Sequence, residues 1–64
     1  MDFRIGDEVV EVNFGWVGTV KAILYNDIVR VNFSQVSLYR HPQDIKLTKK
    51  SIINRFFNED KMQD

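Results

Sequence analysis

Five short stretches of strand-forming residues follow one another within the first 47 residues of the chain, with two to five residues between them. Strands this short and this closely connected do not form a stable flat sheet with one open hydrophobic face. We therefore expect residues 1–47 to curl into a small five-stranded barrel. The whole chain has 64 residues, which leaves no room for a second domain with its own core.

Alternation of apolar and polar residues locates the strands. The third strand has the clearest pattern, because Val29, Val31 and Phe33 can face inward while Arg30 and Asn32 face outward. Two-residue turns connect this strand to its neighbours, and a proline starts a tight helical turn before the last strand. We expect strands at residues 8–13, 19–25, 29–33, 36–40 and 45–47, turns at 26–27 and 34–35, and the helical turn at 42–44.

The inward faces of two strands need separate predictions. In the first strand, Val9 with Glu11 and Val10 with Val12 are competing alternations, so either pair can face the core. A bulge would allow valines from both pairs to pack inward. In the fourth strand, the pattern places residues 36 and 38 inside and residues 37 and 39 on the other face.

From Thr48 onward the apolar spacing changes from that of a strand to that of a helix. Residues 48–64 are therefore expected to form an amphipathic helix and a tail that frays near Glu59. Ser51 is a better N-cap than Thr48, because the two lysines between them would oppose the helix dipole. Four apolar side chains share one stripe about 140° wide on this helix: Ile52, Ile53, Phe56 and Phe57.

This apolar stripe needs a surface to lie on, because an isolated helix of about ten residues is marginal in water. Three arrangements would give the stripe such a surface or leave it waiting for one. The helix can cap the open end of its own barrel, which we expect. It can also pair with a second copy in a homodimer, or stay loose until a partner supplies a groove.

Composition excludes several classes of protein. The absence of cysteine excludes disulfides, thiolate metal sites and thiol nucleophiles. The longest apolar runs are far shorter than the roughly 20 residues that cross a bilayer, and the first residues lack the pattern of a secretory signal. We expect a cytoplasmic protein that does not interact with membranes.

The sequence does not predict an enzyme. His41 is the only histidine, so a metal site would need distant carboxylates. Asp7 and Glu8 would point to opposite faces of a strand, which prevents paired acid–base chemistry. The segment Gly15–Gly18 lacks the spacing and the following Lys-Ser/Thr of a phosphate-binding loop. No catalytic residue, metal or cofactor is expected.

Four features occur in a fixed order along residues 3–47 and carry a resemblance. They are G-D-x-V at Gly6–Val9, G-T-V-x-x-I at Gly18–Ile23, V-x-V-x-F at Val29–Phe33 and D-I-x-L at Asp44–Leu47. Together they resemble the small SH3-like barrels of the KOW and Tudor-like type. The resemblance implies a scaffold that is reused for binding RNA, DNA, peptides or other subunits. In its length, the chain also resembles small accessory proteins of bacteriophages.

Exposed aromatic side chains are the first candidate for a binding site. Trp16, the only tryptophan, lies in a loop where Gly15 and Gly18 would let the backbone turn and offer the ring outward. The alternative is that one or two of the aromatic rings close the ends of the barrel. The predicted partner-binding residues are Phe14, Trp16, Tyr25 and Tyr39.

Basic residues are the second candidate. Residues 1–20 carry one arginine against four acidic residues, whereas residues 21–50 carry six basic residues against two acidic ones. A basic patch beside Tyr39 would suit stacked bases and phosphates, although zero formal net charge removes general attraction to nucleic acid. The other interpretation is a solvated rim. The possible nucleic-acid-binding residues are Arg40, His41, Lys46, Lys49 and Lys50.

The sequence therefore predicts a mainly β protein, a five-stranded SH3-like barrel with a short C-terminal helix, that is a non-catalytic protein-interaction module. A phage-type protein of this kind would bind and modulate a host enzyme or complex. The second hypothesis is a DNA- or RNA-binding KOW-like barrel that uses the segment Arg40–Lys50. A third is a subunit that assembles through its helix.

Overall fold

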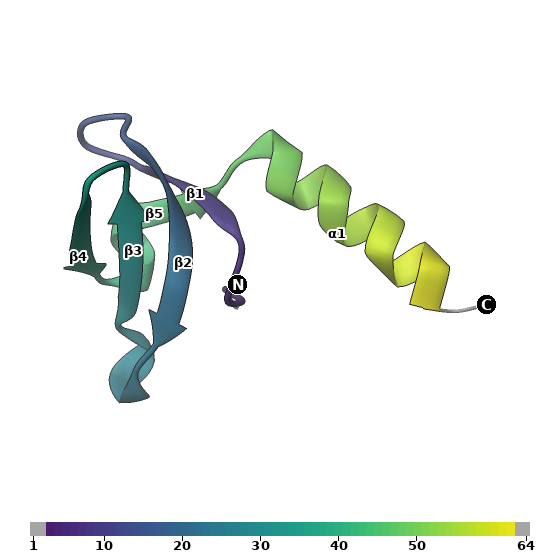
Figure 1. The fold of residues 1–64 in the computed structure, drawn as a ribbon, viewed down its shortest axis with the longest axis horizontal. Coiled ribbons are helices and arrows are strands. Elements are labelled where there is room, and N and C mark those ends of the chain that lie inside the picture. Colours follow the sequence, from purple (N-terminus) through teal and green to yellow (C-terminus); the bar gives the residue numbers. More distant parts are fainter. Residues whose placement is uncertain (1–2, 63–64) are drawn as a thin grey trace.

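Residues 3–62, which the computed structural model describes, form a sheet of five antiparallel strands followed by one helix (Figure 1). The strands are β1 (Glu8–Glu11), β2 (Val17–Ile23), β3 (Val29–Phe33), β4 (Val36–Arg40) and β5 (Ile45–Leu47). Two short 3-10 turns, η1 (Tyr25–Asp27) and η2 (Pro42–Asp44), precede β3 and β5, and the helix is α1 (Lys49–Met62). The last two positions of the expected tail, 63 and 64, lie outside the described residues.

The strands are arranged in the order β4-β3-β2-β1-β5. In Figure 1, β5 runs across the direction of β3 and β4, so the sheet curls over its core. The predicted mainly β fold with a C-terminal helix is therefore confirmed, and the strand order is consistent with an SH3-like topology. Within the described residues the edge strands β4 and β5 do not pair with each other. The sheet therefore stays open where we expected a closed barrel.

The core is built from inward-facing residues on four strands. The alternation predicted for β3 is confirmed, because its first, third and fifth residues are buried while Arg30 is exposed. Phe3, Leu38 and Leu47 pack against this core from its margin. The buried apolar residues are Val9, Val20, Val29, Val31, Phe33 and Ile45.

The register of β1, which the sequence left open, places Val9 and Glu11 on the inward face. Val12 is exposed. The strand ends at Glu11, two residues earlier than expected, because the backbone turns there. The amide of Gly15 donates to the carbonyl of Glu11, and the amide of Glu11 donates to that of Trp16. A carboxylate is therefore buried at the start of this loop.

The turns largely follow the predictions. Asn26 and Asp27 both have positive φ angles, 69° and 63°, as a tight turn between β2 and β3 requires. The strand β2 runs over Val17–Ile23 instead of 19–25, because Tyr25 already belongs to η1. The predicted helical turn at 42–44 and the short strand at 45–47 are confirmed.

The first turn of α1 connects the helix to β1, and its capping corrects our prediction. Thr48 is the N-cap residue, since its Oγ1 accepts a hydrogen bond of 3.2 Å from the Ser51 amide. Ser51 is buried instead, and its Oγ lies 2.7 Å from both the amide and the carbonyl of Glu8. A hydroxyl used for this tertiary contact cannot cap the helix. The helix runs to Met62 and does not end near Glu59.

Candidate functional site

The loop between β1 and β2 presents two stacked aromatic rings. The ring centroids of Phe14 and Trp16 are 5.0 Å apart, with 24° between the ring planes. The two residues are 66% and 47% exposed, so the stacked pair faces solvent. Phe33 contacts the other side of Trp16 edge-on, with 6.1 Å between centroids. Trp16 thus connects the core to an exposed surface.

A shallow groove of about 330 Å³ lies beside Trp16. It is lined by Trp16 of the β1–β2 loop, Val17 of β2, Phe33 of β3, Ser34 of the β3–β4 turn and Val36 of β4. Val36 is half-exposed here, so our prediction that it packs in the core is wrong. It lies on an edge strand, where no further strand covers it. We use the name aromatic rim for four of the exposed apolar residues at this end: Phe14, Trp16, Val17 and Val36.

Glu11 holds the loop of the aromatic rim from inside. It is only 2% exposed, and its Oε1 accepts hydrogen bonds from the amides of Asn13 and Phe14, the second at 3.2 Å. A buried carboxylate needs such donors, because it has lost its hydration. The carboxylate thus fixes the backbone that carries the stacked rings.

Arg40 completes the support of Glu11. Its Nε lies 3.7 Å from Glu11 Oε2, and its guanidinium lies 5.7 Å from the centre of the Phe33 ring. Its Nη1 also donates to the carbonyl of Tyr39 at 2.8 Å. The sequence had suggested Arg40 as a phosphate-binding residue. In the structure it is half-buried and connects β4 to the loop of the aromatic rim.

Two glycines serve this end of the molecule in different ways. Gly15 has a φ of 75°, a conformation that glycine adopts readily, and it allows the turn between Phe14 and Trp16. Gly18 does not have a positive φ, so it is not needed for the turn as we had expected. A Cβ atom there would lie 2.7 Å from the carbonyl oxygen of Asn32. Gly18 is therefore required for the close approach of β2 and β3.

The structure does not place all four predicted partner-binding residues together. Tyr25 is 89% exposed but belongs to η1, which Figure 1 shows at the opposite end of the sheet from the β1–β2 loop. Tyr39 is exposed on β4, paired with Arg30 of β3. Phe14 and Trp16 are thus brought together, whereas Tyr25 lies apart from them. Sequence reasoning missed Val17, whose position beside Gly18 in β2 was the available signal.

The other basic candidates lie around the connection between β5 and α1. His41 precedes η2, Lys46 is on β5, and Lys49 and Lys50 begin α1. All four are exposed. They form an accessible basic segment without Arg40.

The apolar stripe of α1 is not covered by the sheet. Figure 1 shows the helix projecting away from the strands after its first turn. Phe56 and Phe57 are 71% and 63% exposed, and Ile52 and Ile53 are also exposed. Our expectation that the helix caps its own barrel is therefore wrong. The reason is that Thr48 and Ser51 attach the first turn to β1, and from there the helix axis points away from the sheet.

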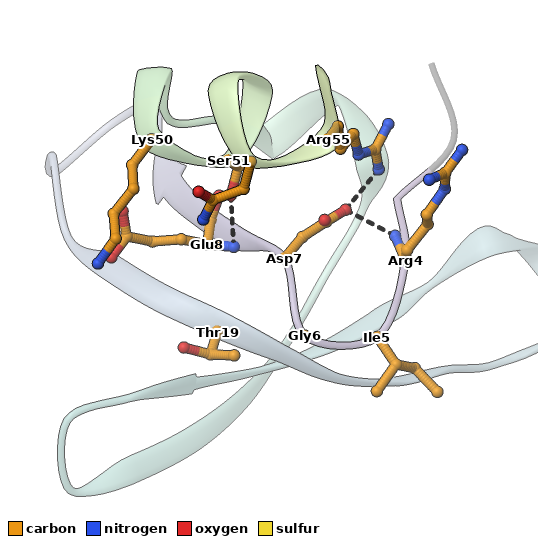
Figure 2. Close-up of a pocket in the computed structure, with 10 residues that line it drawn as sticks. Arg4, Ile5, Gly6, Asp7, Glu8, Thr19, Lys50, Ser51 and Arg55 are labelled. Carbon is orange, nitrogen blue, oxygen red and sulfur yellow. Dashed lines mark hydrogen bonds and ion pairs between the residues drawn. The ribbon is translucent and has the colours of Figure 1, made fainter. Parts of the chain in front are cut away.

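A polar cavity of about 430 Å³ lies between this helix and the N-terminal segment (Figure 2). Asp7 is at its centre: its Oδ2 lies 2.5 Å from Nη2 of Arg55 and accepts a hydrogen bond of 2.7 Å from the Arg4 amide. Ser51 and Glu8 form the adjacent wall. The Arg55–Asp7 contact is a second attachment of the helix, here to the segment that precedes β1, and the charged groups explain the polar character of the cavity.

Comparisons with protein-family models, with curated proteins and with solved structures found no match to this chain. Among the residues that the structure describes, no cluster of three or more histidine, cysteine or acidic side chains is arranged to hold a metal ion. Over the same part of the chain, no helix has the length and apolar character needed to cross a membrane.

Proposed function

We propose that this chain is a non-catalytic protein-interaction module that binds a protein partner through the aromatic rim. The observation that carries this proposal is the exposed stack of Phe14 on Trp16, on a loop held by the buried carboxylate of Glu11. Aromatic rings supply a large contact area with few rotatable bonds. A loop that is already fixed loses little further entropy on binding, which favours affinity.

The chemistry of the rim supports an apolar group on the partner. The groove beside Trp16 is lined by two valines and Phe33, with Ser34 as its polar member. Such a groove suits an aliphatic or aromatic side chain better than a phosphate, because none of the described residues that line it is charged. The module would act by covering a surface of a larger protein.

The test starts by identifying a protein captured by the full chain and then measures binding of the purified pair by calorimetry. Trp16→Ala should weaken binding at least about tenfold, because truncation of a central aromatic side chain commonly costs this much or more. Tyr25→Ala is the matched control, an exposed aromatic residue at the other end of the sheet, and it should change affinity less than about twofold. Equal binding by wild type and Trp16→Ala would refute the proposal.

Nucleic-acid binding is the second candidate, supported by three exposed lysines, Lys46, Lys49 and Lys50, within five residues. The engagement of Arg40 with Glu11 and Phe33 weakens this candidate. Binding to phosphates would weaken steeply with salt, whereas binding through the aromatic rim would change little. A titration of the captured partner at several salt concentrations distinguishes the two.

A further inference from the structure

The outer edge of β4 is an uncovered part of the sheet next to the aromatic rim. β4 is the last strand on its side of the sheet, and among the described strands it pairs with β3 alone. None of its five residues is buried, whereas three of the five residues of β3 are. In Figure 1, β4 forms the left margin of the sheet, and α1 projects from the opposite side. The edge is therefore accessible to another chain.

The register between β3 and β4 determines which backbone groups face this edge. The two-residue turn closes on Phe33 and Val36, and hydrogen-bonded pairs alternate with non-hydrogen-bonded pairs along an antiparallel ladder. Alternate residues from Val36 onward therefore bond to β3, while Ser37 and Tyr39 direct their backbone groups outward. The Tyr39 carbonyl accepts a hydrogen bond of 2.8 Å from Nη1 of Arg40. Within the described part of the chain, the Ser37 amide, the Ser37 carbonyl and the Tyr39 amide have no hydrogen-bond partner.

This row of backbone groups specifies the chemistry of its ligand, because an extended peptide presents donors and acceptors at the same spacing. A peptide strand beside β4 would bond to Ser37 and Tyr39. It would face Val36 and Leu38 in non-hydrogen-bonded pairs, where the Cα atoms of neighbouring strands are only about 4.5 Å apart. Val36 also lines the groove beside Trp16, so the peptide residue opposite Val36 would lie at the margin of that groove.

A second copy of β4 matches this edge less well than a strand of another protein. Antiparallel pairing centred on Leu38 would place Ser37 opposite Tyr39, and it would require the Tyr39 carbonyl, which already accepts from Arg40. Pairing centred on Ser37 would place Tyr39 opposite Gln35, which belongs to the turn before β4. A segment of another protein is free of these restrictions, because its sequence and register are independent of β4.

We propose that the protein partner contributes an extended segment that adds to β4 as a sixth, antiparallel strand, the direction of all four strand pairs in this sheet. This inference rests on the proposed function, since that function supplies the protein partner. The segment carries apolar residues at two alternate positions, opposite Val36 and Leu38, because these two side chains share the core-facing side of the open sheet. The side chain opposite Val36 supplies the apolar group that contacts the groove beside Trp16.

Amide hydrogen exchange of the full chain, free and bound to the purified captured partner, tests the added strand. In the free chain, the Ser37 and Tyr39 amides should exchange faster than the Leu38 amide, which the register directs to β3. Binding should slow exchange at Ser37 and Tyr39 at least about tenfold, because both amides then donate to the partner. Exchange at these two amides that is unchanged by binding would overturn the proposal.

A proline substitution tests the same contact through affinity. Ser37→Pro removes one outward amide, and proline is tolerated on an edge strand where its nitrogen faces away from the ladder. It should weaken binding of the captured partner at least about fivefold. Ser37→Ala is the matched control, because it keeps the amide, and it should change affinity less than about twofold. Equal affinity of folded Ser37→Pro and wild type would refute the added strand, and if Ser37→Pro does not fold, the exchange measurement decides.

The outcomes separate this inference from the proposed function and from self-association. Binding that is lost in Trp16→Ala without protection at Ser37 and Tyr39 would refute the added strand and leave the proposed function standing. Protection at both amides with undiminished binding by Trp16→Ala would refute the aromatic rim as the site and keep the added strand. Protection that rises with the concentration of the chain alone would identify a second copy as the occupant and overturn the proposal.

Discussion

The loop of the aromatic rim and the helix α1 both expose large apolar side chains, but they are held very differently. The loop carries Phe14 and Trp16 above a buried carboxylate, and its backbone amides donate to Glu11. The helix carries its phenylalanines beyond Arg55, which is the last described side chain for which a contact with the rest of the fold is given. Exposed apolar side chains on a fixed backbone suit a preorganised binding site. On a helix that is attached near its start they leave an apolar face exposed to solvent.

The largest effect on this difference is expected when the carboxylate that supports the loop is removed. Glu11→Ala should lower the free energy of unfolding by about 3 kcal/mol, because it leaves two amides without their acceptor and Arg40 without its carboxylate. Chemical denaturation followed by the fluorescence of Trp16, the only tryptophan, measures this change.

Glu11→Gln is the matched control for that variant. The amide keeps an acceptor oxygen for the loop and loses only the charge facing Arg40, so about 1 kcal/mol should be lost. Equal stability of Glu11→Ala and wild type would show that the carboxylate does not support the loop.

A smaller change in stability is expected when the attachment of the helix is weakened. Ser51→Ala removes the hydroxyl that bonds to the amide and carbonyl of Glu8, and it should favour local detachment of α1 by about 1.5 kcal/mol. Trypsin should then cleave after Lys50 about tenfold faster, while the sheet remains folded. Unchanged cleavage would mean that Ser51 does not anchor the helix.

The smallest effects are expected from the exposed rings themselves. Phe14→Ala and Phe57→Ala should each change the stability of the monomer by less than about 0.5 kcal/mol, because neither ring is part of the core. Phe14→Ala should nevertheless shift the emission of Trp16, since it removes the stacked ring. Phe57→Ala should leave the emission unchanged. A large loss of stability in either variant would show that the ring is packed in the folded monomer.

The fold was predictable where local patterns decide the structure. The alternation of Val29, Val31 and Phe33 and the turn at Asn26-Asp27 needed only short-range information. The inward direction of Glu11 did not follow from the sequence. A buried charge is stable only with its partners, and one of these, Arg40, lies 29 residues further along the chain.

The candidate site was predictable only in part, for the same reason. Phe14 and Trp16 share one loop, so their proximity followed from the sequence. The contribution of Val36 depended on β4 being an edge strand, which is a property of the whole sheet. Likewise, the Ser51 side chain is suitable for an N-cap, but its hydroxyl bonds to the backbone of Glu8 instead, a contact between residues far apart in the sequence.

Residue-resolved amide hydrogen exchange tests the difference between loop and helix most directly. At a dilution where the chain is monomeric, the amides of Asn13 and Phe14 should exchange more slowly than the amides of Phe56 and Phe57. The first pair is bonded to a buried carboxylate, whereas the second lies in the part of the helix beyond its attachment. Slower exchange at Phe56 and Phe57 than at the loop amides would contradict the account of a fixed rim and a helix that is attached near its start.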